Sequence, residues 1–406
     1  MRGLEGFRRA AMFAATGVLI AAASTGVANA NQPHVAKLAK TVNMHAQRVC
    51  AQPTSPGVAA CLSQVMVPNK GTSPSASTPP ASGLTPAQLR NAYNLNGTAS
   101  GGRTVAIVDA YGYPNLERDL GVYRSQFGIP ACTRANGCLR VLNQSGGNTL
   151  PSFNVGWAGE TALDVDAVSA TCPDCKILVV EASSASVTNL GTAANTASKQ
   201  PGVVAISNSY GAGDLSDSSY GSYYNHPGIA VTASTGDNGY KGASFPASSA
   251  YVTAVGGTSL ASAGNARGWN ETAWSGAGSG CSAYNAALAA AAPFNTGCAN
   301  RASSDVSAAA NPGSGGLAIY WPTSSRSSSW AQVGGTSESS PIIASVYALS
   351  GNTAGTANAI PYANPSALWD ITSGSTGSCP TIQWCTAGTG WDGPTGLGTP
   401  NGVGAF

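Results

Sequence analysis

Residues 334–349 read GGTSESSPIIASVYAL. A run of small residues leads here directly into an apolar, helix-forming segment, which places Ser337 at or just before a helix N-terminus. Backbone N–H groups are unpaired at that end of a helix, and the positive end of the helix dipole lies there. Ser337 is therefore either an N-cap, as serines are in many helices, or a nucleophile whose developing oxyanion is held by nearby N–H groups.

Apolar runs of strand length lie earlier in the chain, and segments long enough for helices separate them. Runs that are apolar on both faces are typical of a parallel sheet that is covered on both sides. We therefore predict an α/β fold with an open, mostly parallel sheet and helices on both faces, and a functional site at the carboxyl ends of the strands. The predicted strands are residues 104–110, 176–182, 203–207, 229–233 and 252–255, and residues 158–171 are predicted to form a crossover helix.

The composition indicates a secreted protein that binds neither nucleic acid nor membrane. Of the 406 residues, 9% are charged, and the formal net charge is +2 without any basic run. Such a chain does not favour nucleic acid or an anionic membrane as a partner. Residues 1–30 have the pattern of a signal peptide, with arginines, an apolar core and a final Ala-Asn-Ala. We expect an extracellular monomer, and its few carboxylates predict a fold that tolerates acid.

The chain divides into three parts on the sequence alone. After the signal peptide, residues 31–83 are predicted to be a short pro-segment, with a helical piece at 34–48 and a Ser/Pro-rich linker at 71–83. The alternative for this linker is a simple spacer. The main domain is predicted to span residues 84–406, and its first helix should begin with Thr85 as the cap and Pro86 in the first position.

The cysteines fall as neighbours along the chain. An even number in a secreted protein indicates disulfides. The CPDC sequence at 172–175 could instead be a redox motif or half of a zinc site, but the chain has no second CxxC and only three histidines. We predict five local disulfides that pair Cys50 with Cys61, Cys132 with Cys138, Cys172 with Cys175, Cys281 with Cys298, and Cys379 with Cys385.

A nucleophilic serine needs a base, and histidine is the usual one. Two of the three histidines, His34 and His45, fall in the predicted pro-segment. The third, His226, lies in a polar turn before a predicted strand, where a solvated surface residue is the ordinary interpretation. A serine hydrolase that uses His226 stays open as an alternative, but the sequence disfavours it.

Carboxylates offer a different base. Glu160 and Asp164 are four residues apart on the predicted crossover helix and therefore lie on one face. Two like charges in this arrangement share a proton, which raises one pKa and makes a usable general base or acid; the alternative is a solvated acidic face. Asp237 follows a predicted strand in a Gly-rich turn. It is either an ordinary turn residue or, when protonated, a donor to an oxyanion.

Together these motifs resemble the sedolisins, the serine-carboxyl peptidases, which have a subtilisin-like fold. The resemblance covers roughly residues 84–406 and rests on ExxxD in a helix, Gly-Asp after a strand and Gly-Thr-Ser-x-x-x-Pro, in that order. It implies that Ser337 is the nucleophile and Glu160 the general base and acid. It also implies that Asp164 orients Glu160 and that Asp237 stabilises the oxyanion.

The resemblance also implies a function and a second group of site residues. The expected function is a secreted endopeptidase that hydrolyses protein or peptide substrates at acidic pH; the alternative is a non-catalytic binding protein with the same fold. Asp109, at the end of a predicted strand, is expected to support the two acids of the helix. Ser209, Tyr210 and Gly211 resemble the edge to which a peptide substrate adds as a strand.

Near the C-terminus, two glycine-rich segments resemble the calcium site of the family. Carried over, Asp370 and Asp392 would supply carboxylates, and Ile371, Gly388 and Gly390 would supply backbone carbonyls to one Ca²⁺. Calcium prefers about 6–8 oxygen ligands, and glycines let a chain curl so that carbonyls converge. The alternative is a glycine-rich loop without metal.

Overall fold

The computed structural model describes residues 43–53, 55–69, 76–352 and 356–406. All of them fall in one compact unit, Val42–Phe406. The predicted signal peptide at 1–30, the first part of the predicted helix at 34–48 and residues 71–75 of the predicted linker lie outside the described residues.

The centre of this unit is a mostly parallel sheet, as predicted. Within the described residues it has eight strands: β4 (Thr104–Ala110), β5 (Leu139–Asn143), β6 (Lys176–Ala182), β7 (Val203–Asn208), β9 (Ala230–Ser234), β11 (Thr253–Ser262), β12 (Trp269–Ala273) and β15 (Val306–Ala309). Their order is β12-β11-β9-β7-β4-β6-β5, and β15 pairs with β11. Only the β11–β12 pair is antiparallel in this sheet.

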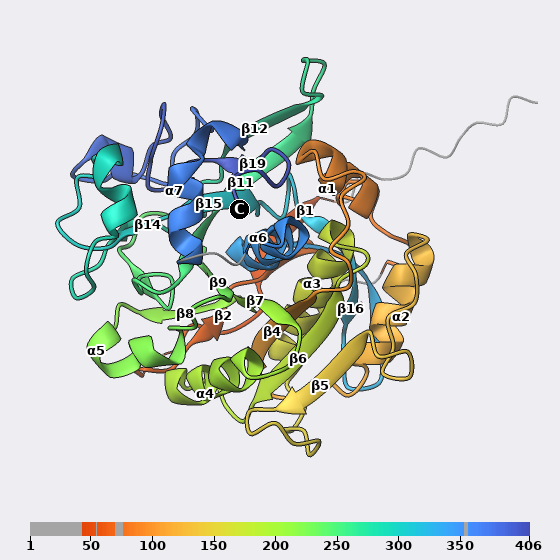
Figure 1. Ribbon diagram of the computed structural model, residues 1–406. Coiled ribbons are helices and arrows are strands. Elements are labelled where there is room, and N and C mark those ends of the chain that lie inside the picture. The colour runs from red at the N-terminus through yellow and green to blue at the C-terminus, as the bar shows by residue number, and fades with distance from the viewer. Residues whose placement is uncertain (1–42, 54, 70–75, 353–355) are drawn as a thin grey trace, which may run out of the picture. The chain divides into compact units, whose positions relative to one another are not determined.

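Helices cover both faces of the sheet, which confirms the predicted fold class (Figure 1). Successive side chains of a strand point to opposite faces; accordingly Val105 and Ile107 of β4 belong to one apolar cluster, and Ala106 and Val108 to the other. The first cluster contains α1, α2, α3 and α6, and the second contains α4. The helices are α1 (Pro86–Ala92), α2 (Leu116–Gln126), α3 (Val155–Thr171), α4 (Val187–Ser198), α5 (Asp217–Tyr220), α6 (Thr336–Ser350) and α7 (Ile360–Ala363).

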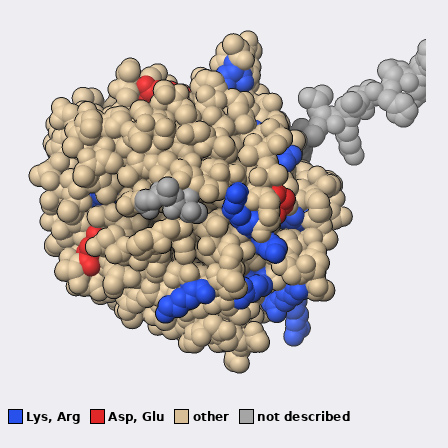
Figure 2. All heavy atoms as spheres, in the orientation of Figure 1, with Lys and Arg blue, Asp and Glu red and all other residues tan. Residues whose placement is uncertain are grey.

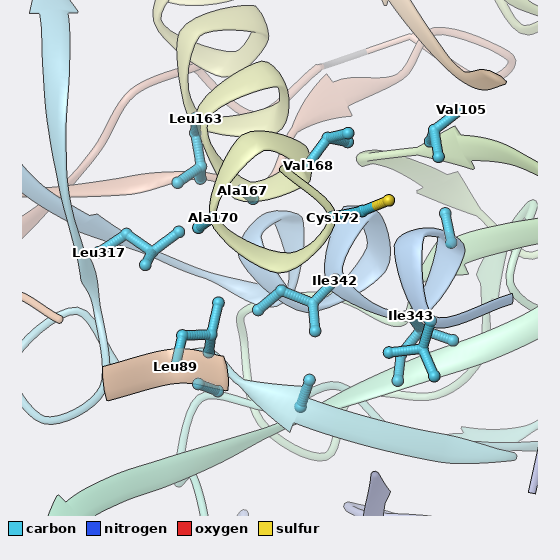
Figure 3. Packing of buried hydrophobic residues seen from close by; sticks show 14 of the residues in the cluster. Leu89, Val105, Leu163, Ala167, Val168, Ala170, Cys172, Leu317, Ile342 and Ile343 are labelled. Carbon is cyan, nitrogen blue, oxygen red and sulfur yellow. The ribbon is translucent and has the colours of Figure 1, made fainter. Parts of the chain in front are cut away.

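The two helices that carry the candidate site, α3 and α6, pack against each other in the first cluster. Figure 3 shows Leu163 and Val168 of α3 beside Ile342 and Ile343 of α6, and these four side chains are fully buried. Burying such a side chain stabilises the fold by roughly 1.5–3 kcal/mol. The packing therefore fixes the first turn of α6 relative to the middle of α3.

Local signals explain where two of the helices begin. The Thr85 side chain accepts a hydrogen bond from the Gln88 N–H, with Pro86 in the first helical position, as predicted. Helix α3 begins at Val155, three residues earlier than residue 158, because the Asn154 side chain accepts from the Trp157 N–H at 3.1 Å.

The N-terminal residues differ from the prediction. Residues 44–48 were predicted to be helical, but they form strand β1 (Met44–Arg48), which pairs antiparallel with β3 (Gln64–Pro68). The helix prediction is wrong there because pairing with a distant strand outweighs the local preference of a short segment. Residues 43–69 also belong to the same compact unit as residues 84–406, so the folded unit starts earlier than residue 84. Removal of residues 31–83 as a pro-segment stays a prediction.

Two small sheets join this N-terminal segment to the rest of the unit. In one, β1, β3, β17 (Ser328–Gly334) and β16 (Leu317–Pro322) lie in that order. In the other, β2 (Ala60–Cys61) and β10 (Ser244–Phe245) pair with opposite edges of β8 (Tyr210–Gly213). The remaining strands are β13 (Gly280–Cys281), β14 (Ala302–Ser303), β18 (Leu368–Trp369) and β19 (Thr399–Pro400). Short 3₁₀ helices span Gly221–Tyr223, Ala289–Phe294, Ala357–Ala359, Pro365–Ala367 and Ile382–Trp384.

All five predicted disulfides are present, including Cys172–Cys175, so the CPDC motif is a disulfide and not half of a zinc site. Within the part of the chain that the structure describes, no helix is both long and apolar enough to cross a membrane. Figure 2 shows a face on which most residues are uncharged and acidic residues are sparse, in keeping with the 9% charged residues of the chain.

Candidate active site

Ser337 is the second residue of α6 and is fully buried. The N-cap of this helix is Gly335, with φ at +113°, so capping does not explain the serine. A side chain at Gly335 would overlap the carbonyl oxygen of Leu62, and its Cβ would lie 2.6 Å from Asp237 Oδ2. Glycine is required there, both for the positive φ and for this close approach. The Ser337 hydroxyl donates to the carbonyl oxygen of Ser209 at 3.1 Å.

Glu160 faces this serine from α3 and is fully buried. Its Oε2 accepts a hydrogen bond from the backbone N–H of Ser63 at 3.0 Å. Burial raises the pKa of Glu160 well above its usual value, and the charge of Asp109 adds to this effect. The hydrogen bond from the Ser63 N–H and the nearby Ser337 hydroxyl oppose it because they favour the ionised form.

Asp164 and Asp109 complete a buried acidic cluster with Glu160. Asp164 lies one turn after Glu160 on α3, Asp109 lies on β4, and both are fully buried. Burial raises the pKa of Asp164 well above its usual value, and the charges of Asp109 and Glu160 raise it further. Burial also raises the pKa of Asp109, to about 7, with a contribution from Glu181. The predicted pair on one helix face is therefore buried and not a solvated acidic face.

Asp237 lies beside the first turn of α6, in the turn after β9. Its Oδ1 accepts hydrogen bonds from both the N–H and the hydroxyl of Thr336 at 2.8 Å, and its Oδ2 accepts from Gln64 Nε2 at 3.3 Å. Burial raises the pKa of Asp237 to about 6, although the hydrogen bonds from Thr336 lower it. Because Thr336 precedes Ser337, these bonds hold the carboxyl group of Asp237 next to the serine.

The structure brings the four predicted catalytic residues together from three separate segments of the chain. Glu160 lies close enough to interact electrostatically with Asp109, Asp237 and the Ser337 hydroxyl, and its Oε1 is buried without a hydrogen-bond partner. His226 is not part of this group: its Nε2 hydrogen-bonds to the carbonyl oxygen of Tyr223 at 2.9 Å. The geometry thus favours a carboxylate over a histidine as the partner of the serine.

The predicted substrate edge also borders the site. Ser209 and Ser337 exchange hydrogen bonds of 3.1 Å, since each hydroxyl donates to the other residue's carbonyl oxygen. Tyr210 and Gly211 follow in strand β8. The edge of β8 that faces Ser337 is paired with β2 of the same chain.

The predicted calcium ligands also come together, at a distance along the chain from the serine. Asp370 Oδ2 accepts from the Gly390 N–H at 3.0 Å, and Asp392 Oδ2 accepts from the Gly388 N–H at 3.1 Å. Ile371 is buried next to Asp370. Burial raises the pKa of Asp392 to about 7, and the charge of Asp370 contributes. Two facing carboxylates in a glycine-rich loop fit a hard cation that takes oxygen ligands.

No group of three or more His, Cys, Asp or Glu side chains that could hold a metal ion occurs among the residues that the structure describes. A calcium ion in this loop would therefore depend on backbone carbonyls for most of its ligands. That requirement agrees with the predicted ligand set, in which three of the five residues are Ile371, Gly388 and Gly390.

The sequence did not indicate several residues that surround the acids. Ser63 and Gln64, which hydrogen-bond to Glu160 and Asp237, lie in the segment predicted to be removed. Glu181 pairs with Asp109 in the β4–β6 ladder. The sequence did contain a pattern that could have indicated Asp109 and Glu181, because each is the sixth residue of a seven-residue apolar strand.

The buried acids predict a fold that is more stable in acid. A carboxyl group whose pKa is higher in the folded state binds its proton more tightly there, so its stabilisation is present at low pH and lost as the pH rises through the folded-state pKa. For Asp237, with a pKa raised from 3.8 to about 6, the free energy of unfolding should be about 2 kcal/mol larger at pH 4.5 than at pH 7.5. Asp109 acts in the same direction. Urea denaturation of the Ser337→Ala protein at both pH values measures this, and greater stability at pH 7.5 would contradict it.

The chain matches no protein-family model. Among curated proteins, it is similar to tripeptidyl-peptidase sed1 of Aspergillus fumigatus, at 42% identity over 77 residues, which are 17% of this chain and 12% of that protein. It is also similar to aorsin of Aspergillus oryzae, at 46% identity over 76 residues, with 17% of this chain and 12% of that protein covered. The matched region thus spans about 12% of the length of these relatives.

Similarity to solved structures extends over most of the chain. The structure of Pseudomonas sedolisin, a serine-carboxyl proteinase complexed with pseudo-iodotyrostatin, is similar with a TM-score of 0.65 and 25% identity, and covers 79% of this chain and 96% of that one. The S41 psychrophilic protease shares the fold. Its TM-score is 0.51 at 16% identity, and the match covers 80% of this chain and 99% of that one. These similarities support the resemblance to the sedolisins and show that the subtilisin-like fold extends over most of the chain.

Proposed function

We propose that this chain is a secreted serine-carboxyl endopeptidase that hydrolyses protein or peptide substrates at acidic pH. The observation that carries the proposal is the convergence of Ser337, Glu160, Asp164 and Asp237, none of them more than 5% exposed, at the start of α6. Its five disulfides support an oxidising compartment outside the cell.

In the proposed reaction, the Ser337 hydroxyl attacks the carbonyl carbon of a peptide bond while Glu160 takes its proton. Glu160 then gives the proton to the leaving amine, and water repeats the sequence on the acyl-enzyme. Asp164 and Asp109 act through Glu160, which must be ionised to take the proton. The charge of Asp109 raises the pKa of Glu160, and the charges of Asp109 and Glu160 raise the pKa of Asp164. They are positioning residues in this scheme.

Asp237 is proposed to stabilise the oxyanion, and this role sets the pH range. The carboxyl group can donate a hydrogen bond to an oxyanion only when it carries its own proton. Because its pKa is about 6, this form dominates below pH 6. Above that pH, the group becomes a negative charge beside a developing negative charge, so we expect activity to decline towards neutral pH.

The alternative function is a secreted binding protein that retains the fold without catalysis. It predicts no hydrolysis by the wild-type protein and equal peptide binding by wild type and Ser337→Ala. The experiment that separates the two functions is incubation of purified wild type at pH 4 with an unrelated denatured protein, followed by mass spectrometry of new amino termini. New termini in wild type and none in Ser337→Ala support the peptidase, whereas no termini in a folded, processed wild type support the binding protein.

We also propose one calcium site in the loop that contains Asp370, Ile371, Gly388, Gly390 and Asp392. Its two carboxylates would supply the charged ligands, and the three other residues would supply carbonyl oxygens. A bound cation would offset the burial, and the repulsion by Asp370, that raise the pKa of Asp392. Since the loop lies apart from Ser337 in sequence and supplies none of the catalytic groups, its expected role is to stabilise the fold.

Removal of calcium should lower the melting temperature. A ligand at 100 times its dissociation constant stabilises the folded state by about 2.7 kcal/mol, so a chelator should lower Tm by about 3–4 °C at this chain length. Differential scanning calorimetry of the Ser337→Ala protein, with and without chelator, measures the shift. Calcium should restore Tm, magnesium at the same concentration should not, and Asp392→Asn should remove the response. An identical Tm with and without chelator would contradict the site.

A further inference from the structure

The peptide-binding edge of β8 is occupied by the chain's own residues. Strand β2 runs antiparallel to β8, with Ala60 opposite Gly211 and Cys61 opposite Tyr210, and Figure 1 shows the two strands side by side. Leu62 continues this pairing, since its N–H donates to the carbonyl oxygen of Ser209 at 3.3 Å. An extended peptide added to this edge is the arrangement predicted for a substrate.

The residues after Leu62 are held on the other side of the site. In the β3–β17 pair, Gln64 lies opposite Gly334 and Val65 opposite Val333. Strand β17 leads directly into Gly335 and the first turn of α6. The segment is therefore held by backbone pairing both before and after the bond between Leu62 and Ser63.

The atoms of the peptide bond between Leu62 and Ser63 lie next to the catalytic groups. The carbonyl oxygen of Leu62 lies against Gly335, beside Asp237 Oδ2, where the oxyanion of an attacked carbonyl would need a donor. The N–H of Ser63 donates to Glu160 Oε2 at 3.0 Å, so the nitrogen that would leave is within reach of the group that would protonate it. The Ser337 hydroxyl and the Leu62 N–H meet at the same carbonyl oxygen, that of Ser209.

We propose that residues 59–65 lie in the cleft as a substrate and that Ser337 cleaves the chain's own peptide bond between Leu62 and Ser63. This inference rests on the proposed function. A bond forms between Ser337 Oγ and the carbonyl carbon of Leu62, the bond to Ser63 N breaks, and Glu160 transfers the serine proton to that nitrogen. Water then hydrolyses the ester, which leaves a carboxylate on Leu62, an amine on Ser63 and a free Ser337.

The fold keeps the two products together after the cut. Strand β1 precedes the cut and pairs with β3, which follows it, and β2 pairs with β8. The disulfide between Cys50 and Cys61 lies entirely before the cut, so no covalent bond joins the pieces. In native buffer the upstream piece should stay bound until an added substrate displaces it, and it should separate in denaturant without any reducing agent.

The side chain of Leu62 indicates which residue the site accepts before a cut. It contributes to the wall of a cavity of about 250 Å³, which is also lined by Gly211, Gly236, Gly278 and Ser244. Glycines leave this space open to a side chain of the substrate. A charged residue in place of Leu62 should therefore bind poorly.

The test follows the full chain, purified at pH 7.5 and shifted to pH 4. Denaturing mass spectrometry without reductant should show two pieces, one that ends at Leu62 and one that begins at Ser63. Ser337→Ala should stay intact, and Leu62→Asp should be cut at least about tenfold more slowly than the matched control Met66→Asp, which places the same charge in β3 beyond the bond. The half-time should not depend on protein concentration, because the bond lies in the same molecule as the serine.

Hydrolysis of an unrelated denatured protein, measured in the same samples, separates the two claims. If wild type degrades that protein while its own Leu62–Ser63 bond stays intact, or is cut elsewhere, the self-cleavage inference fails and the proposed function stands. If neither is cut, the proposed function fails and the inference fails with it. Equal rates for Leu62→Asp and Met66→Asp would also overturn the inference, and circular dichroism of both variants shows whether each is folded.

Discussion

Replacement of Glu160 by Gln is expected to reduce kcat at least about a thousandfold, since a general base contributes roughly 10²–10⁴ to the rate and this residue also serves as the acid. The amide has the shape of the carboxyl group, and its oxygen can still accept the hydrogen bond from the Ser63 N–H. It has no basic oxygen that could take the proton of Ser337. The fold should therefore survive while catalysis is lost, and steady-state kinetics at pH 4 with a peptide substrate measures the effect.

A matched control exists on the neighbouring helix. Glu338 is as fully buried as Glu160 and, like it, has a pKa that burial raises well above the usual value. Glu338 is the next residue after Ser337 in the sequence. Within the described residues, no hydrogen bond joins its side chain to Ser337, Glu160 or Asp237. Glu338→Gln should therefore keep kcat within about threefold of wild type. A Glu160→Gln enzyme with normal kcat would contradict the proposed base.

Replacement of Asp237 by Asn should extend activity to higher pH. The carboxyl group has a pKa of about 6, so it donates a hydrogen bond below this pH and loses that ability above it. Wild-type kcat/KM should then fall about tenfold per pH unit, or about a hundredfold at pH 8. The Asn side chain can donate at every pH, so this decline should be much weaker in the variant. The pH profile of kcat/KM from pH 4 to 8 checks the result.

Two further variants sharpen this prediction. Asp237→Ala has no donor at any pH, and its activity should be about 10²–10³ lower throughout, as for other oxyanion donors. Asp166→Asn changes a buried acid of α3 that accepts a hydrogen bond from the Tyr320 N–H at 3.2 Å, and it should leave the profile unchanged. If Asp237→Asn declines above pH 6 as wild type does, another group controls the pH dependence.

The sequence predicted the strands of the central sheet well where both faces of a strand are buried. Strands β4 and β6 match their predicted bounds because both faces of each are buried, which produces an unbroken apolar run. Strand β9 is displaced by one residue, Ala230–Ser234 against 229–233. Strand β5 was missed because its five residues, LRVLN, contain two polar residues and only alternate positions are buried.

The candidate site could be predicted where its motifs are local. The spacing of Glu160 and Asp164 and the sequence before α6 are short patterns, and the structure places these residues together. The position of residues 59–65 could not be predicted in the same way. Strand pairing between β2 and β8 joins residues about 150 positions apart, and local periodicity shows that a segment is extended without showing which edge it joins.

The central claim is that Ser337 is activated by carboxylates and not by histidine. Its most direct test is cleavage of a denatured protein from pH 3 to 9, with purified wild type, Ser337→Ala and His226→Ala compared at equal concentration. We predict activity on the acid side that is at least about 10⁴-fold lower in Ser337→Ala and unchanged in His226→Ala. Equal activity of wild type and Ser337→Ala, or loss of activity in His226→Ala, would contradict the account.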